Sequence, residues 1–138
     1  MKYYLNVLKN YATLSGRARR KEYWMFALFN LIFLIVAAVI DNVLGTTFKT
    51  DSFLYPSGHF PYGWVYLVYG LVVFIPGVAV AVRRLHDQDK SGWYFWVVLI
   101  PIAGAIWILV LLCTEGTIGD NKYGPDPKAM ERALIIVP

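Results

Sequence analysis

Charge is what this sequence has little of. Only 16% of its 138 residues are charged, against about 25% in an average soluble protein, whereas 58% are hydrophobic and 17% are aromatic. A soluble domain of this size has too little interior to bury so many large apolar side chains. Together with a mean hydropathy of +0.51, this composition excludes an ordinary water-soluble fold and predicts a membrane protein.

Cysteine is almost absent as well. The single cysteine, Cys113, excludes an internal disulfide, and no paired His or Cys spacing indicates a zinc site. A cleavable signal peptide is not expected, because the first apolar stretch begins only at Trp24 and is too long for one. We therefore predict no metal and no cofactor, and we expect the first apolar segment to remain as an anchor.

Three apolar segments have the length of membrane spans. Residues 24–44, 64–82 and 93–113 each come close to the roughly 20 residues that a helix needs to cross a bilayer. Pro76 and Pro101 lie inside the second and third segments and predict kinks there. The sequence thus predicts three transmembrane helices within a single membrane domain, residues 1–138.

The segment before the first span predicts an amphipathic helix over residues 1–15. Apolar side chains recur at helical spacing, with lysines on the opposite face: Tyr4, Val7, Leu8, Tyr11 and Leu14. Such a helix is expected to lie in the headgroup plane, and the alternative is a cap packed on the spans. The predicted fold class is therefore an all-α membrane protein, with three transmembrane helices preceded by an N-terminal amphipathic interfacial helix.

The polar remainder predicts two further segments. Residues 45–63 form an outer loop rich in aromatic residues, expected to fold back on the membrane surface: Phe48, Phe53, Tyr55, Phe60 and Tyr62. Residues 114–138 form a polar tail, in which the glycines and prolines of 119–127 predict a compact exposed turn. Within the first span, we expect Asn30 to hydrogen bond to another helix and Asp41 to be hydrated near the outer end.

Lysine and arginine are concentrated in two places, and this bias predicts the orientation. The N-terminal segment and the connection 83–92 carry the cationic excess, so both are expected to be cytoplasmic. An odd number of spans then places the C-terminus outside.

The first basic cluster lies at the start of the first span. Arg17, Arg20 and Lys21 fall on one side of a helix together with Trp24, where they predict a site for anionic headgroups. Glu22 is expected to pair with Arg19, three residues earlier. The alternative is an ordinary orientation signal without a ligand.

The second basic cluster lies between the second and third spans. Arg83, Arg84 and His86 predict phosphate contacts, with Asp87 and Ser91 in supporting roles. The alternative is structural, with Ser91 or Asp89 capping the third helix and the arginines extending toward the interface. A final set of aromatic residues is expected to anchor the helix ends at the interface: Tyr23, Trp24, Trp64 and Trp93.

These clusters resemble one family. Arg20, Glu22, Tyr23 and Trp24, the run from Arg83 to Asp87 with Ser91-Gly92-Trp93, and Asn121 with Tyr123-Gly124-Pro125 and Pro127 occur in the order seen in the YhaH-like small bacterial inner-membrane proteins. That family carries domain of unknown function 805. The resemblance covers roughly residues 4–127 and implies a multi-pass protein of a bacterial inner membrane without an established reaction or ligand. With the orientation above, the C-terminus is then expected in the periplasm.

The function predicted is that of a non-enzymatic membrane protein. Its basic clusters are expected to bind anionic phospholipid headgroups or a membrane-protein partner, which includes a second copy of the chain. Nucleic acid is not an expected partner, because the cations lie between apolar spans. Two alternatives remain open: an oligomeric transporter or channel subunit with a polar path past Asn30, and a lipid-headgroup enzyme that uses His86 and Asp87.

Overall fold

The computed structural model describes residues 2–49 and 58–136. Its residues group into two compact units, one made of Met1–Phe26 and Pro76–Pro138 and the other of Ala27–Ile75. The single domain expected from the sequence stays a prediction. Helices α2 and α3 each contribute residues to both units.

Two helices have the length and composition of membrane spans. Helix α2 runs over Arg20–Leu44 and α3 over Trp64–His86. Only 11% and 28% of their most apolar stretches are buried, which differs from the mostly buried core helix of a soluble protein. Helix α3 continues four residues beyond the predicted end at residue 82. Arg83, Arg84 and His86 therefore belong to its last turn and not to the connection that follows.

In the unit Ala27–Ile75, a buried carboxylate bonds the end of α2 to the start of α3. Strands β1 (Thr47–Lys49) and β2 (His59–Gly63) pair antiparallel between the two helices. Asp41 is fully buried and accepts hydrogen bonds from the Thr46 hydroxyl at 2.5 Å and from the Gly63 N–H at 3.0 Å. It also accepts from the first turn of α3, from the N–H groups of Val65 at 3.0 Å and Tyr66 at 2.8 Å. The expected hydration of Asp41 is therefore wrong, because the start of α3 supplies the donors that water was expected to supply.

Two other expectations for this unit have different outcomes. Asn30 does bond to the neighbouring helix, since the Tyr69 hydroxyl donates to its Oδ1 at 2.7 Å, which confirms that prediction. The segment 45–63 contains the β1–β2 hairpin where an irregular loop was expected. Phe53 and Tyr55 of the expected aromatic loop lie in residues 50–57, outside the described residues.

At the N-terminus, helix α1 covers Lys2–Lys9 and is shorter than the expected 1–15. Tyr4 and Val7 are buried, and the Tyr4 ring stacks on Phe26 of α2 with centroids 5.4 Å apart. The Asn6 amide donates to Glu22 at 3.1 Å. These contacts show α1 packed on the start of α2, while its position in a headgroup plane stays a prediction.

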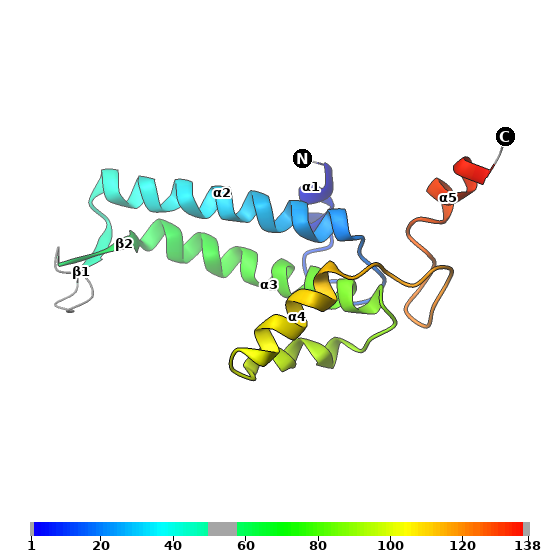
Figure 1. Cartoon of the computed structure of the whole chain (residues 1–138). Helices are drawn as coiled ribbons and strands as arrows, with labels where there is room; N and C mark the ends of the chain where they lie inside the picture. The colour runs from blue at the N-terminus through cyan, green and yellow to red at the C-terminus, as the bar shows by residue number, and fades with distance from the viewer. Residues whose placement is uncertain (1, 50–57, 137–138) are drawn as a thin grey trace. The chain divides into compact units, whose positions relative to one another are not determined.

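The third predicted span is not one helix. Residues 92–113 form a 3-10 helix, η1 (Gly92–Leu99), and an α-helix, α4 (Ala103–Cys113), which lie against each other (Figure 1). Pro101 has no N–H to donate, and Ile102 has a φ of 61°, in the left-handed region. The prediction of a single helix over 93–113 is wrong, because the backbone at these two residues reverses direction.

Gly104 allows η1 and α4 to pack closely. A Cβ at this position would overlap the Val97 carbonyl, with its carbon 2.9 Å away, and the Ile100 Cβ at 3.1 Å. We expect Gly104→Ala to lower the free energy of unfolding by about 1–3 kcal/mol, as overpacking does. Thermal unfolding in detergent measures this. Gly70→Ala is the matched control, because a Cβ there meets nothing within 4 Å and alanine favours a helix. Equal melting temperatures for the two variants would contradict this packing.

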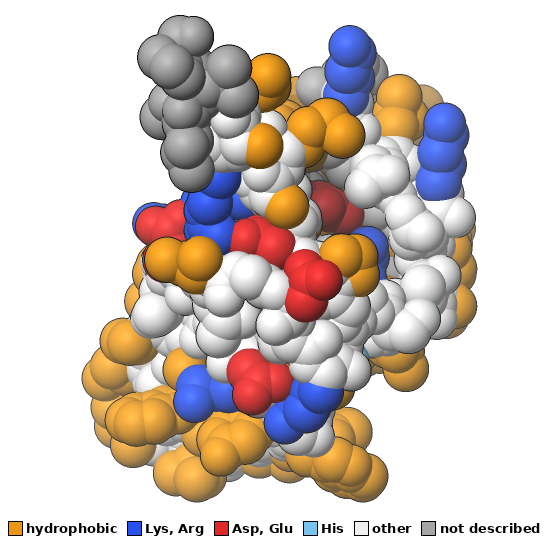
Figure 2. Space-filling view, turned by 90° about the vertical axis from the view of Figure 1, so that its right-hand side faces the viewer, with side chains coloured by type: hydrophobic (Ala, Val, Ile, Leu, Met, Phe, Trp, Pro, Cys, Tyr) orange, Lys and Arg blue, Asp and Glu red, His pale blue; other side chains and the backbone are white. Residues whose placement is uncertain are grey.

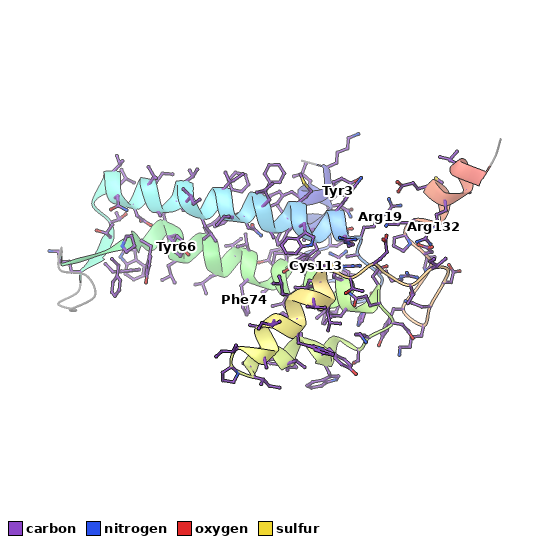
Figure 3. All side chains as sticks on the ribbon, viewed as in Figure 1. Tyr3, Arg19, Tyr66, Phe74, Cys113 and Arg132 are labelled. Carbon is purple, nitrogen blue, oxygen red and sulfur yellow. The ribbon has the colours of Figure 1, made fainter. Side chains whose placement is uncertain are left out.

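After α4 the tail runs through turns to the short helix α5 (Ala129–Ile136). Asn121 and Gly124 form an isolated bridge, each donating its N–H to the other's carbonyl at 3.1 and 3.0 Å. The single cysteine, Cys113, is exposed at the end of α4 (Figure 3). The start of the tail therefore follows directly on the last turn of α4.

Candidate functional site

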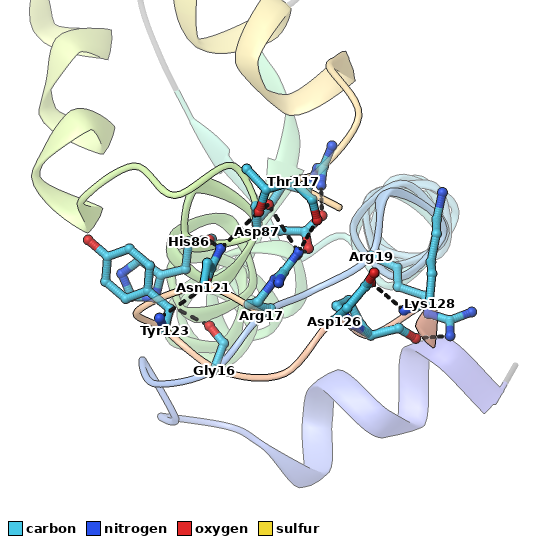
Figure 4. Close-up of polar contacts among 12 residues, drawn as sticks. Gly16, Arg17, Arg19, His86, Asp87, Thr117, Asn121, Tyr123, Asp126 and Lys128 are labelled. Carbon is cyan, nitrogen blue, oxygen red and sulfur yellow. Dashed lines mark hydrogen bonds and ion pairs between the residues drawn. The ribbon is translucent and has the colours of Figure 1, made fainter. Parts of the chain in front are cut away.

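Asp87 is the centre of the main polar cluster (Figure 4). Its carboxylate accepts from the Arg17 Nε at 3.0 Å and from the Arg84 Nη1. The three side chains are 7%, 2% and 0% exposed. A buried guanidinium needs a counter-charge, and Asp87 supplies it to both arginines. Asp87 therefore joins the N-terminal segment to the end of α3 through ion pairs that are almost inaccessible to water.

Backbone carbonyls of the tail complete the bonding of both arginines. Arg17 donates to the carbonyls of Thr117 and Gly119, each at 2.6 Å. Arg84 donates to the Leu112 carbonyl at 3.2 Å and to the Thr114 carbonyl. The two arginines therefore join the start of the tail to the N-terminal segment and to α3.

Further backbone contacts reinforce this arrangement. The Thr117 N–H donates to the Asp87 carbonyl at 2.8 Å, and the Asn121 amide donates to the His86 carbonyl at 2.9 Å. Gly116 lies so close to the Asp87 carboxylate that a Cβ would overlap it. The segment expected to be an exposed turn is thus packed against the end of α3.

Arg83 belongs to a separate buried pair. Its Nη1 lies 3.4 Å from the Glu22 carboxylate, which also accepts from Asn6. Among the described residues, the Arg83 Nε and Nη2 atoms are buried without a hydrogen-bond partner. The expected pairing of Glu22 with Arg19 is wrong, because Arg19 turns toward the tail, where it bonds to Glu131 at 2.9 Å and to the Pro127 carbonyl.

His86 is held by its neighbours. Its ring stacks on Tyr123 with centroids 3.9 Å apart, and its Nδ1 lies 3.3 Å from the Gly16 carbonyl. Ser91 accepts from the Trp93 N–H at 3.4 Å and caps η1, as the structural alternative for this cluster expected. The carboxylate of Asp87 bonds to Arg17 and Arg84. The enzymatic alternative requires His86 and Asp87 to converge with Ser91 or Asp89 in a water-accessible cleft, and it stays a prediction.

Two carboxyls of the tail have pKa values below their ordinary ones. The Lys128 ammonium hydrogen bonds to Glu115 and lowers the pKa of that carboxyl. Burial raises the pKa of Asp126, but the N–H groups of Lys128 and Gly119 that donate to it and the charge of Arg132 outweigh burial, so that the net shift is downward. Both groups are therefore ionised at neutral pH and bond parts of the tail to one another.

A basic pocket lies at the start of α2, and we use this name for one set of residues. It has a volume of about 440 Å³ and is lined by four cations, one carboxylate and one indole: Arg19, Arg20, Lys21, Lys128, Glu131 and Trp24. Arg19 lies near the start of α2 and Arg132 on the tail nearby (Figure 3). Positive side chains from α2 and from the tail therefore surround one hollow.

The structure divides the expected anion-binding arginines into three groups. Arg17 and Arg84 come together at Asp87, while Arg83 is buried beside Glu22. Arg20 is 46% exposed and lines the basic pocket. Of the expected aromatic anchors, Trp24, Trp64 and Trp93 are exposed and Tyr23 is half-buried, and their depth in a membrane stays a prediction.

Sequence reasoning missed the contribution of the tail. Five residues of the tail contact the N-terminal segment or α3, or line the basic pocket: Thr117, Gly119, Asn121, Tyr123 and Lys128. The signal available was the run of glycine, asparagine and proline in 116–127, which we interpreted as a turn. Within residues 2–49 and 58–136, no group of three His, Cys, Asp or Glu side chains is arranged to hold a metal ion.

Comparison with known proteins identifies the family. The model of DUF805, described as a protein of unknown function, matches residues 11–125. Over 128 residues, 93% of the chain, the sequence is 47% identical to the inner membrane protein YhaH of Escherichia coli K12, of which 98% is covered. It is 46% identical to the inner membrane protein YhaI of the same strain, of which 97% is covered. No solved structure matches. The resemblance inferred from the motifs is thereby confirmed, and the chain belongs to the DUF805 family, whose relatives here are bacterial inner-membrane proteins.

Proposed function

We propose that this inner-membrane protein binds the phosphate of an anionic phospholipid headgroup in the basic pocket, on the cytoplasmic side. The observation that carries the proposal is the pocket itself, in which four cationic side chains face one carboxylate. Guanidinium and ammonium groups bind phosphate through charge-assisted hydrogen bonds. The proposal is for a binding protein and not an enzyme.

The cations of the pocket are accessible, and their ion pairs lie at the surface: Arg19 pairs with Glu131, and Lys128 pairs with Glu115. Arg20 has its nearest carboxylate, Glu115, 3.9 Å away, and both side chains are about half exposed. Ion pairs at such exposure contribute at most about 1 kcal/mol. A phosphate can therefore replace them at little cost, which is not true of the buried pairs around Asp87.

The place of the pocket in the sequence supports a headgroup ligand over a soluble one. Arg20 and Lys21 immediately precede the apolar part of α2, and Trp24 lines the pocket. Tryptophan favours the bilayer interface, and lysine and arginine favour the cytoplasmic side. The pocket then lies at the depth of the lipid phosphates.

The proposed site differs from the one expected from the sequence. Arg17, Arg83, Arg84 and His86 are left out, because their side chains are buried in contacts with other protein groups. Arg20 and Lys21 remain, and Arg19 and Lys128 join them. The transporter or channel alternative needs Asn30 to line a polar path. The Oδ1 of Asn30 instead accepts a hydrogen bond from Tyr69, which does not favour that alternative.

The test is native mass spectrometry of the full chain with cardiolipin or phosphatidylglycerol. We expect Arg20→Gln with Lys128→Gln to weaken the binding of both lipids about 30-fold, since each cation near an anionic headgroup contributes about 1 kcal/mol. Binding of zwitterionic phosphatidylethanolamine is expected to be unchanged.

The matched control removes two positive charges elsewhere. Lys90→Gln with Lys122→Gln has the same net charge, and neither lysine lines the pocket. Equal loss of anionic lipid from both double variants would mean diffuse attraction, and no loss from the pocket variant would mean that the pocket is not the site. Either result overturns the proposal.

A further inference from the structure

The two helices that replace the predicted third span are each too short to cross a bilayer. The eight residues of η1 rise about 2.0 Å each and the eleven of α4 about 1.5 Å each, so that both reach about 16 Å. The hydrocarbon core is about 30 Å thick. Each helix therefore matches the thickness of one leaflet.

The surface of this helix pair is apolar on its outside. Leu99 and Ile102, at the reversal between the helices, are 70% and 80% exposed, and Trp93, Ile106 and Trp107 are exposed along the two helices. Figure 2 shows hydrophobic side chains gathered along the lower edge, where Figure 1 places η1 and α4, below the charged ones. An exposed apolar surface of this kind indicates contact with an apolar environment and not with water.

Three of the four backbone N–H groups at the reversal, residues 100–104, donate to nearby backbone carbonyls. The N–H groups of Ile100, Ala103 and Gly104 donate to carbonyls at 3.0, 2.6 and 3.0 Å, and Pro101 has no N–H. Unsatisfied N–H groups are what keeps irregular backbone out of hydrocarbon. These bonds lower the cost of placing the turn in a lipid environment.

Both ends of the helix pair are bonded to the same turn of α3. On entry, the Lys90 N–H donates to the Leu85 carbonyl at 3.1 Å. On exit, Arg84 binds the Leu112 and Thr114 carbonyls, and Thr117 binds Asp87. The two ends therefore lie at the same level, on the same side of any membrane that α3 crosses.

We infer that η1 and α4 form a re-entrant hairpin, which enters one leaflet from the side of the Asp87 cluster and leaves on that side. The partner of its apolar surface is the acyl-chain region of that leaflet. The tail from residue 114 onward then lies on the same side as the N-terminal segment, in place of the predicted periplasmic C-terminus. This inference does not depend on the headgroup site.

Cysteine accessibility in the full chain tests both parts of the inference. In a Cys113→Ser background, single cysteines replace Thr13 in the N-terminal segment, Lys122 in the tail, Lys49 beyond the far end of α2, and Leu99 at the reversal. A membrane-impermeant maleimide is applied to spheroplasts and to inside-out vesicles. We expect positions 13 and 122 to react from one side, position 49 from the other, and position 99 from neither before detergent is added.

Each other outcome overturns the inference. Reaction of position 122 from the side of position 49 would mean a complete third span. Reaction of position 99 from water on either side would mean that the hairpin is not inserted. Because Lys122→Cys alters the tail, alkaline phosphatase fused to the C-terminus of the unchanged chain reports the location of the C-terminus independently. A C-terminus on the opposite side of the membrane from position 13 would contradict the inference that both lie on one side.

Discussion

Asp87→Asn is expected to destabilise the protein by about 3–5 kcal/mol, the range for breaking a buried ion pair from one side. The amide keeps the size of the carboxylate but loses its charge, and it leaves Arg17 and Arg84 buried without a counter-charge. The measurement is thermal unfolding of the purified protein in detergent. Because Arg17 also binds the Thr117 and Gly119 carbonyls, we expect the tail to become more sensitive to protease in the variant.

The control for this variant is Asp89→Asn. Asp89 lies two residues further along and is exposed, its nearest cation is Lys122 at 3.7 Å, and its φ of 57° is one that asparagine adopts readily. The change there is expected to cost less than about 1 kcal/mol. If the two variants melt at the same temperature, Asp87 does not hold the cluster together.

Asp41→Asn is expected to have the second large effect, a loss on the order of 3 kcal/mol. A buried carboxylate that accepts from three backbone N–H groups and a hydroxyl loses strong bonds to charge when it becomes an amide, whose NH₂ group also faces donors. The lost hydrogen bonds are those that connect the end of α2 with the β1–β2 hairpin and the start of α3. Thermal unfolding with hydrogen exchange at residues 63–66 locates the loss.

A graded comparison makes this expectation specific. Thr46→Val removes one of the four donors and keeps the shape of the side chain, so we expect it to lower the free energy of unfolding by about 1 kcal/mol. Hydrogen exchange at Val65 and Tyr66 should rise strongly only for Asp41→Asn. Equal exchange in both variants would mean that the carboxylate does not cap α3.

Part of the fold follows from local sequence. The span ending at residue 44 ends there in the structure, and the bond to Asn30 exists, because a polar amide in an apolar helix needs a partner nearby. The break at Pro101 was expected only as a kink. Periodicity and apolar length do not distinguish one helix of 21 residues from two short ones that fold back, since every residue in both is apolar.

The candidate site was less predictable than the spans. Asp41 was expected to meet water because its position near a helix end says nothing about the strand and helix that later cover it. Arg17 and Arg20 stand three residues apart in one basic cluster, yet one is buried against Asp87, 70 residues away, and the other lines an open pocket. Nothing in the sequence connects Lys128 with the pocket, because it is distant in sequence from the residues of α2 that line it.

The sequence by itself determined that this is a membrane protein of the DUF805 family with at least two apolar helices, because composition and segment length decide which solvent a chain requires. Only the tertiary structure decided which cations are free. Arg17 is buried by acceptors that include the Gly119 carbonyl, 102 residues away, whereas Arg20 is about half exposed and its nearest carboxylate is 3.9 Å away. Distances of this kind exist only once the tail has packed against the N-terminal segment and the end of α3.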